Sequence, residues 1–110
     1  PKIVWHYFEQ ILEIPRPSKE ETKIRNFLIS FAKTHNLVHK VDKAGNLLII
    51  KSATPGFENK KTIILQSHLD MVGEKNSDTI HNFSTDPIAG TMPIKLNKAK
   101  NNNNEVIFNL

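Results

Sequence analysis

The chain has 110 residues, with 15 Lys or Arg against 11 Asp or Glu, so its formal net charge is +4. This length predicts about one domain. Its core should be modest, because chains of this size hide only about two-thirds of their unfolded surface. No cysteine is present. That absence excludes disulfide scaffolds, thiolate-bound zinc, iron–sulfur clusters and thiol proteases.

Neither a membrane nor a nucleic acid is an expected partner. Apolar runs such as Ile63–Leu65 fall far short of the roughly 20 residues that cross a bilayer. Residues 1–6 show no basic region followed by a long apolar stretch, so we expect no uncleaved signal peptide and a cytoplasmic location. Lys and Arg are scattered among Asp and Glu, whereas nucleic-acid binders gather them on one face or in one run.

Two amphipathic helices are predicted at the beginning of the chain. Apolar residues recur at helical spacing over about residues 2–13, and Pro15 and Pro17 end that helix. Ser18 is expected to cap a second helix, with Glu21 completing a capping box. That helix should end at residues 35–36, where Asn36 can take the left-handed conformation. Its predicted apolar stripe consists of Ile24, Phe27, Leu28 and Phe31.

Extended segments follow the helices. Residues 37–41 and 47–50 should form a hairpin around the turn formers at 42–46. Residues 62–66 are a continuous apolar run, typical of a strand that is buried on both faces. This order favours helices packed on a sheet. Two regions are expected: residues 1–88, which contain these predicted elements, and a divergent, Asn- and Lys-rich tail over 89–110. In that tail, Asn101–Asn104 is expected to be a solvated loop or disordered. Residues 105–108 are expected to be a short strand or an unstructured end.

The residues that could carry chemistry follow the predicted strand at 62–66. His68 and Asp70 are two residues apart, and residues i and i+2 of an extended chain point to the same side. Such a pair suits a metal site, because one ring nitrogen can bind the metal while the other donates to the carboxylate. Zinc fits imidazole and carboxylate ligands, although cobalt or manganese could replace it. The alternative is a histidine at a strand end that makes ordinary surface contacts with a loop Asp.

The segment from Ile63 to Val72, Ile-Ile-Leu-Gln-Ser-His-Leu-Asp-Met-Val, closely resembles the metal-site strand of the aminoacyl-histidine (Xaa-His, carnosinase-type) dipeptidases. These enzymes belong to the zinc-dependent aminoacylase and carboxypeptidase family. The resemblance extends in register over about residues 3–88. It includes four further segments: 14–21, 42–49, 53–59 and 75–88, the last with its Asp-Thr-x-His-x-Phe pattern.

The resemblance implies an α/β fold, namely the amino-terminal part of a zinc-exopeptidase-like three-layer α/β/α catalytic domain with a mixed sheet. It also implies metal-dependent hydrolysis of dipeptides with a carboxy-terminal His at a site holding two zinc ions. By this likeness His68 is a metal ligand, and Asp70 is the catalytic-site carboxylate that supports it. The metals of such a site lower the pKa of a bridging water, and a Glu elsewhere takes its proton.

The likeness stops near residue 88. The family's bridging Asp, its Glu pair and its later ligands have no counterpart in residues 89–110, whereas a catalytic zinc takes about three protein ligands. We therefore expect an amino-terminal fragment, from a truncated gene, a frameshift or deliberate shortening, that is inactive alone and does not retain zinc. The alternative function is that of a non-catalytic α/β remnant or interaction module. Exposed sheet edges and apolar faces also predict self-association.

The remaining histidines carry weaker signals. His6 falls on the polar side of the first predicted helix and should lie at the surface. His35 and His39 flank a helix end and a strand, where solvated positions are expected. His81 lies within the segment that resembles the dipeptidases, so a place near the substrate and a structural role both remain open.

Overall fold

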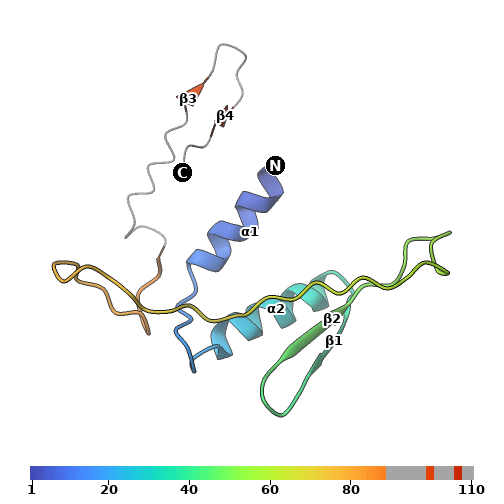
Figure 1. Cartoon of the computed structure of the whole chain (residues 1–110), viewed down its shortest axis with the longest axis horizontal. Coiled ribbons are helices and arrows are strands. Elements are labelled where there is room, and N and C mark those ends of the chain that lie inside the picture. Colours follow the sequence, from blue (N-terminus) through green and yellow to red (C-terminus); the bar gives the residue numbers. More distant parts are fainter. Residues whose placement is uncertain (89–98, 101–105, 108–110) are drawn as a thin grey trace.

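The computed structural model describes residues 1–88, 99–100 and 106–107 (Figure 1). These described residues form two helices and two small antiparallel sheets, one of β1 with β2 and one of β3 with β4. The short strand predicted near 106–108 is present, whereas the predicted loop at 101–104 lies outside the described residues. The elements are, in chain order, α1 (Lys2–Leu12), α2 (Thr22–Thr34), β1 (Val38–Val41), β2 (Leu47–Ile50), β3 (Ala99–Lys100) and β4 (Val106–Ile107).

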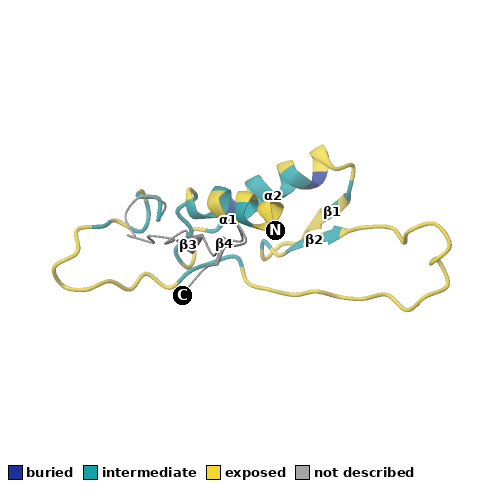
Figure 2. Cartoon of the chain, turned by 90° about the horizontal axis from the view of Figure 1, so that it is seen from above, coloured by how far each residue is buried: buried dark blue, intermediate teal, exposed yellow. Residues whose placement is uncertain are grey.

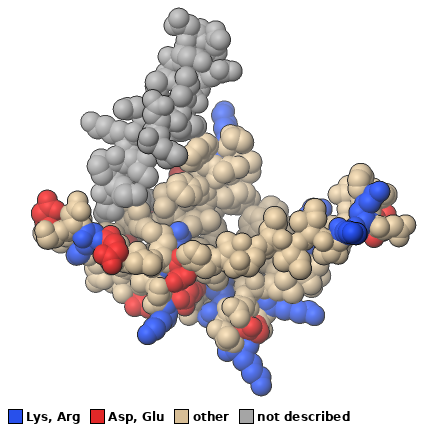
Figure 3. All heavy atoms as spheres, viewed as in Figure 1, with Lys and Arg blue, Asp and Glu red and all other residues tan. Residues whose placement is uncertain are grey.

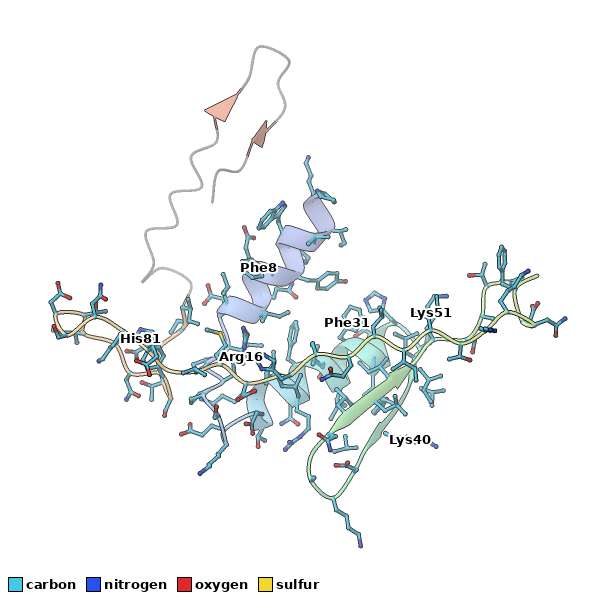
Figure 4. The ribbon with its side chains drawn as sticks, in the orientation of Figure 1. Phe8, Arg16, Phe31, Lys40, Lys51 and His81 are labelled. Carbon is cyan, nitrogen blue, oxygen red and sulfur yellow. The ribbon has the colours of Figure 1, made fainter. Side chains whose placement is uncertain are left out.

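Helix α1 has the predicted position and packs against α2 through aromatic side chains. The ring of Tyr7 meets that of Phe31 edge-on, with centroids 5.3 Å apart. The Tyr7 hydroxyl also lies 3.3 Å from Nε2 of His35, just past the end of α2. Edge-to-face pairs of this kind add about 0.5–1.5 kcal/mol beyond the apolar area that they bury. In Figure 4, Phe8 marks α1 and Phe31 marks α2.

Helix α2 begins later than the sequence predicts, and Ser18 does not cap it. The helix starts at Thr22, and no side chain caps its first turn. Residues 17–20 instead form a turn in which the Glu20 N–H donates to the Pro17 carbonyl over 2.9 Å. Lys19, in the third position, has φ of 75°, as a type II turn requires, and this conformation is incompatible with a helix. Glu21 stabilises the turn by accepting the Lys19 N–H at 2.6 Å.

The core lies beneath α2. Ile24 and Ala32 are buried, with 2% and 0% of their surface exposed, and they lie on one face of the helix. The other predicted stripe residues, Phe27, Leu28 and Phe31, are half-buried. The helix ends as predicted, with His35 as its last cap and Asn36 at φ of 53°. Among the residues whose burial the structure describes, the buried positions are confined to this helix (Figure 2).

The predicted hairpin is present, with Val38 opposite Ile50 and Val41 opposite Leu47. Its turn is held by Asp42, whose Oδ1 accepts the Ala44 and Asn46 N–H groups at 2.9 and 2.8 Å. Along β2 the residues alternate between half-buried and exposed positions. One face therefore packs toward α2, and the opposite face keeps apolar side chains at the surface.

The predicted strand at 62–66 is not a strand in this structure. The segment is extended, but residues 61–69 make no backbone–backbone hydrogen bond with the described residues. Ile63, Ile64 and Leu65 are 82%, 84% and 92% exposed. A strand that is buried on both faces needs neighbouring strands and covering layers. Local apolar character predicted the extended conformation, but within the described part of the chain nothing pairs with it or covers it.

The described residues form a partial α/β domain, in which α2 lies against the small antiparallel sheet of β1 and β2 (Figure 1). The second helical layer and the mixed sheet that the resemblance implies are not among them. Within the same residues, neither helix is long and apolar enough to span a bilayer.

Candidate functional site

Residues 16–18 and 70–71 meet at a junction that brings distant parts of the chain together. The Met71 N–H donates to the Arg16 carbonyl over 2.9 Å, and Pro17 forms an isolated parallel bridge with Met71. The Arg16 guanidinium donates to the Met71 sulfur at 2.9 Å and to the Ile11 carbonyl at 3.4 Å. Partial burial lowers the pKa of Arg16 from its ordinary, very high value. Figure 4 shows Arg16 where the extended segment crosses the connection between the helices.

His68 and Asp70 lie together beside this junction. Nδ1 of His68 is 2.8 Å from Oδ1 of Asp70, so the two side chains point to the same side, as their spacing predicts. The other carboxylate oxygen, Oδ2, accepts the Ser18 hydroxyl at 2.6 Å. The His68 side chain is 79% exposed, whereas that of Asp70 is 31% exposed. The carboxylate is thus bound on both oxygens, and the imidazole reaches toward solvent.

The hydrogen bonds of Asp70 set its charge. The Ser18 hydroxyl, and next the His68 imidazole, hold the pKa of the Asp70 carboxyl below its usual value. The carboxylate is therefore ionised at neutral pH and can only accept hydrogen bonds. A neutral His68 then donates from Nδ1, which leaves the lone pair of Nε2 directed away from Asp70. This is the tautomer that a metal-binding histidine adopts when a carboxylate orients it.

The pair borders a cleft of about 510 Å³. One wall comes from the start of α2 and from the hairpin turn, which are joined by a 3.3 Å hydrogen bond from Arg25 to the Gly45 carbonyl. The extended segment 66–70 forms the opposite wall. The side chains and backbone that line it belong to Glu21, Arg25, Ala44, Gly45, Asn46, Leu47, Gln66, Ser67, His68, Leu69 and Asp70. Charges of both signs therefore surround a space large enough for a small polar ligand.

The residues of this cleft do not by themselves make a metal site. Within the described part of the chain, no group of three or more His, Cys, Asp or Glu side chains is placed to hold one ion. Nε2 of His68 can supply a single ligand, and Oδ1 of Asp70 is engaged in orienting it. Catalytic zinc takes about three protein ligands. The arrangement matches one ligand with its supporting carboxylate, and the remaining ligands would have to come from elsewhere.

The other histidines lie outside the cleft. His81 packs edge-on against Phe83 with ring centroids 4.6 Å apart, and its Nε2 is buried without a partner among the described residues. Figure 4 shows it in the loop beyond the junction. Its role stays open between substrate contact and structure. The remaining three, His6, His35 and His39, are absent from the lining of this cleft.

Two features of the site are not predictable from local sequence patterns. Ser18 has the spacing of a cap for α2, yet its hydroxyl binds Asp70, 52 residues away. The Arg16–Met71 contact links residues 55 apart. No local pattern signals such contacts; the only hint is that both segments belong to the stretches that resemble the dipeptidases.

Two of three comparisons with known proteins find proteins that are named dipeptidases. No family model matches the sequence. The chain is 44% identical over 88 residues, 80% of its length, to the cytosol non-specific dipeptidase of Escherichia coli (strain K12). The structure matches the crystal structure of aminoacylhistidine dipeptidase from Vibrio alginolyticus with a TM-score of 0.76 and 44% identity over 79% of this chain. The chain spans 18% of the length of each relative. Over the matched residues, the chain is therefore similar to these two dipeptidases, as an amino-terminal fragment of such a protein would be.

Proposed function

We propose that this chain contributes the first metal ligand, with its orienting carboxylate, to a dipeptide-hydrolysing site. The observation that carries the proposal is the 2.8 Å hydrogen bond between His68 and Asp70 at the edge of the cleft. The relatives are dipeptidases by name, and the match covers four-fifths of this chain. His68 would ligate the metal, and Asp70 would fix its ring.

The hydrolytic step itself needs groups that the described residues do not supply. One imidazole ligand is too few for a catalytic zinc. We therefore propose that the chain alone neither retains two zinc ions nor hydrolyses dipeptides. Activity would require further carboxylate and imidazole ligands from outside residues 1–88.

The proposed substrate is a dipeptide, and a carboxy-terminal His is its narrower form. One relative is named for aminoacylhistidine substrates, and the other is named non-specific. The cleft, bordered by both acidic and basic groups, suits a small zwitterion such as a dipeptide. The name of the Escherichia coli relative also supports a cytoplasmic location.

The mixed distribution of surface charge supports a proposal without a nucleic-acid partner. On the face shown in Figure 3, basic and acidic side chains are interspersed, and the blue atoms form no continuous stripe. A nucleic-acid surface would instead gather Lys and Arg along one stripe. The alternative to the dipeptidase proposal is a non-catalytic α/β module. Its support is the incomplete ligand set of the described residues.

A chimera tests the proposal. The 88 residues of the Escherichia coli dipeptidase that match this chain would be replaced by the corresponding residues of this chain. We expect the chimera to hydrolyse dipeptides, to lose this activity with a chelator and to recover it with zinc. His68→Ala in the chimera should abolish hydrolysis, because it removes a ligand. His39→Ala is the matched control, since it removes a histidine of β1 that does not line the cleft.

The outcomes separate the two functions. A folded chimera that binds no metal and cleaves no dipeptide would favour the non-catalytic module. Activity that survives His68→Ala would contradict the assignment of His68. Comparison of Ala-His with dipeptides lacking His would then decide the narrower substrate.

A further inference from the structure

Ser18 occupies an unexpected place beside the dyad of His68 and Asp70. Its hydroxyl donates to Oδ2 of Asp70 at 2.6 Å, whereas His68 binds Oδ1 at 2.8 Å. A carboxylate held on one oxygen can still rotate about its side-chain bonds. Held on both oxygens by groups from different parts of the chain, it keeps one orientation. The Ser18 hydroxyl therefore helps to fix the orientation of the Asp70 carboxylate.

The position of Ser18 is itself fixed by backbone contacts. It stands at the second position of the turn over residues 17–20, which is closed by a 2.9 Å hydrogen bond. The left-handed conformation of Lys19 is unfavourable for a residue with a side chain, so the turn is maintained against a local preference. One residue before Ser18, Pro17 bridges to Met71, and Met71 directly follows Asp70. The donor and the acceptor are thus tied together through the backbone.

We propose that Ser18 is a positioning residue, which holds the Asp70 carboxylate so that His68 keeps its proton on Nδ1 and presents Nε2 to a metal. The inference rests on the proposed function only in that Nε2 of His68 is taken as the atom that binds the metal. The contacts that carry it are those of this chain alone. In water a neutral imidazole favours the opposite tautomer, with the proton on Nε2, so the exposed His68 needs a fixed acceptor to reverse that preference.

A second effect of the serine has the opposite sign. Its hydroxyl also withdraws negative charge from the carboxylate, and this weakens the bond from His68. If charge withdrawal dominates, loss of Ser18 strengthens the Nδ1–H bond. If positioning dominates, loss of Ser18 weakens it. The direction of the change in tautomer therefore distinguishes the two roles.

The test is ¹⁵N NMR of the full 110-residue chain with labelled histidine, at a pH where His68 is neutral. In the wild-type chain we expect the Nδ1–H tautomer to dominate at His68. Ser18→Ala should lower the ratio of Nδ1–H to Nε2–H by about two- to tenfold, the range that one net hydrogen bond supports. Ser18→Thr retains the hydroxyl and should restore the ratio.

Ser67→Ala is the matched control. Ser67 lines the same cleft next to His68, but its side chain makes no hydrogen bond with the residues that the structure describes. It should leave the tautomer unchanged. The amide resonance of Met71, observed in a uniformly ¹⁵N-labelled sample, reports whether the junction survives each substitution. An unchanged or increased Nδ1–H fraction in Ser18→Ala, with the junction intact, overturns the proposal. So does failure of Ser18→Thr to restore the ratio in a chain whose junction is intact.

This readout is independent of hydrolysis. If the tautomer shifts as expected but the chimera is inactive, Ser18 positions Asp70 and the proposed function is wrong. If the chimera is active and the tautomer does not respond to Ser18→Ala, the positioning role is wrong and the proposed function stands.

Discussion

Gly45 closes the hairpin turn against α2, and replacing it by alanine tests how the cleft wall is built. Gly45 has φ of 92°, and a Cβ at this position would lie 2.5 Å from Nη1 of Arg25. That nitrogen donates to the Gly45 carbonyl over 3.3 Å. A methyl group would therefore meet both an unfavourable backbone conformation and the tip of a flexible side chain.

The expected cost has three parts. An L-residue in the left-handed region costs about 1–2 kcal/mol. Displacing the guanidinium forfeits one hydrogen bond, worth about 0.5–1.5 kcal/mol net. Alanine also lowers the conformational entropy of the unfolded chain, which stabilises the folded state by about 0.4–1 kcal/mol. Together these three contributions predict that Gly45→Ala lowers the free energy of unfolding by about 0.5–3 kcal/mol.

Gly56→Ala provides the comparison. Gly56 has φ of 87°, but a Cβ there would meet nothing within 4 Å. Urea denaturation followed by circular dichroism would measure both variants, alone and with Arg25→Ala. We expect Gly45→Ala to be the more destabilising of the two, and its excess to vanish in the Arg25→Ala background, because contacting residues couple in double-mutant cycles. Two results would contradict the contact between Gly45 and Arg25 in the cleft wall. One is an equal loss of unfolding free energy in Gly45→Ala and Gly56→Ala, and the other is a larger loss in Gly45→Ala that persists without Arg25.

Three further predictions concern other parts of the chain. Hydrogen bonds, first from the Asn46 side chain and next from its N–H, keep the pKa of Asp42 below its usual value. The stability that this carboxylate contributes is therefore present above about pH 4 and is lost as the pH falls through its lowered pKa. Asp42→Ala should flatten the acid limb of a pH titration of unfolding; an unchanged limb would contradict the role of the turn. The exposed run at 63–65 predicts self-association with a second copy. Sedimentation should show oligomers that Ile64→Lys converts to monomer, and a wild-type chain that stays monomeric at high concentration would contradict this. His68→Ala should leave the thermal midpoint unchanged, because its side chain is 79% exposed; a large loss would indicate a structural histidine.

Local patterns predicted those elements whose stabilising contacts lie close in sequence. The stripe that includes Ile24 predicted that α2 forms, although not where it begins, and Asn36 marked its end. The turn formers at 42–46 predicted the hairpin, because Asp42 binds the N–H groups of its own turn. The two-residue spacing of His68 and Asp70 predicted their convergence, since only extended backbone was needed.

Distant contacts decided what local patterns could not show. Ser18 fits a capping box by spacing, but the left-handed Lys19 and the acceptor Asp70 draw it into a turn. The apolar run at 63–65 has strand character, yet a strand forms only where neighbours pair with it. The metal roles of His68 and Asp70, the tail at 89–110 as a separate region and the predicted self-association stay predictions.

Zinc titration of the ¹⁵N-histidine-labelled chain tests the central claim most directly, because each of the five histidines gives its own resonances. We predict that the Nε2 resonance of His68 shifts at a lower zinc concentration than any nitrogen of the other four, while Nδ1 keeps its proton and its bond to Asp70. Zinc binding to His68 through Nδ1, or a shift of another histidine at a lower zinc concentration, would contradict the assignment of this pair as a metal ligand with its orienting carboxylate.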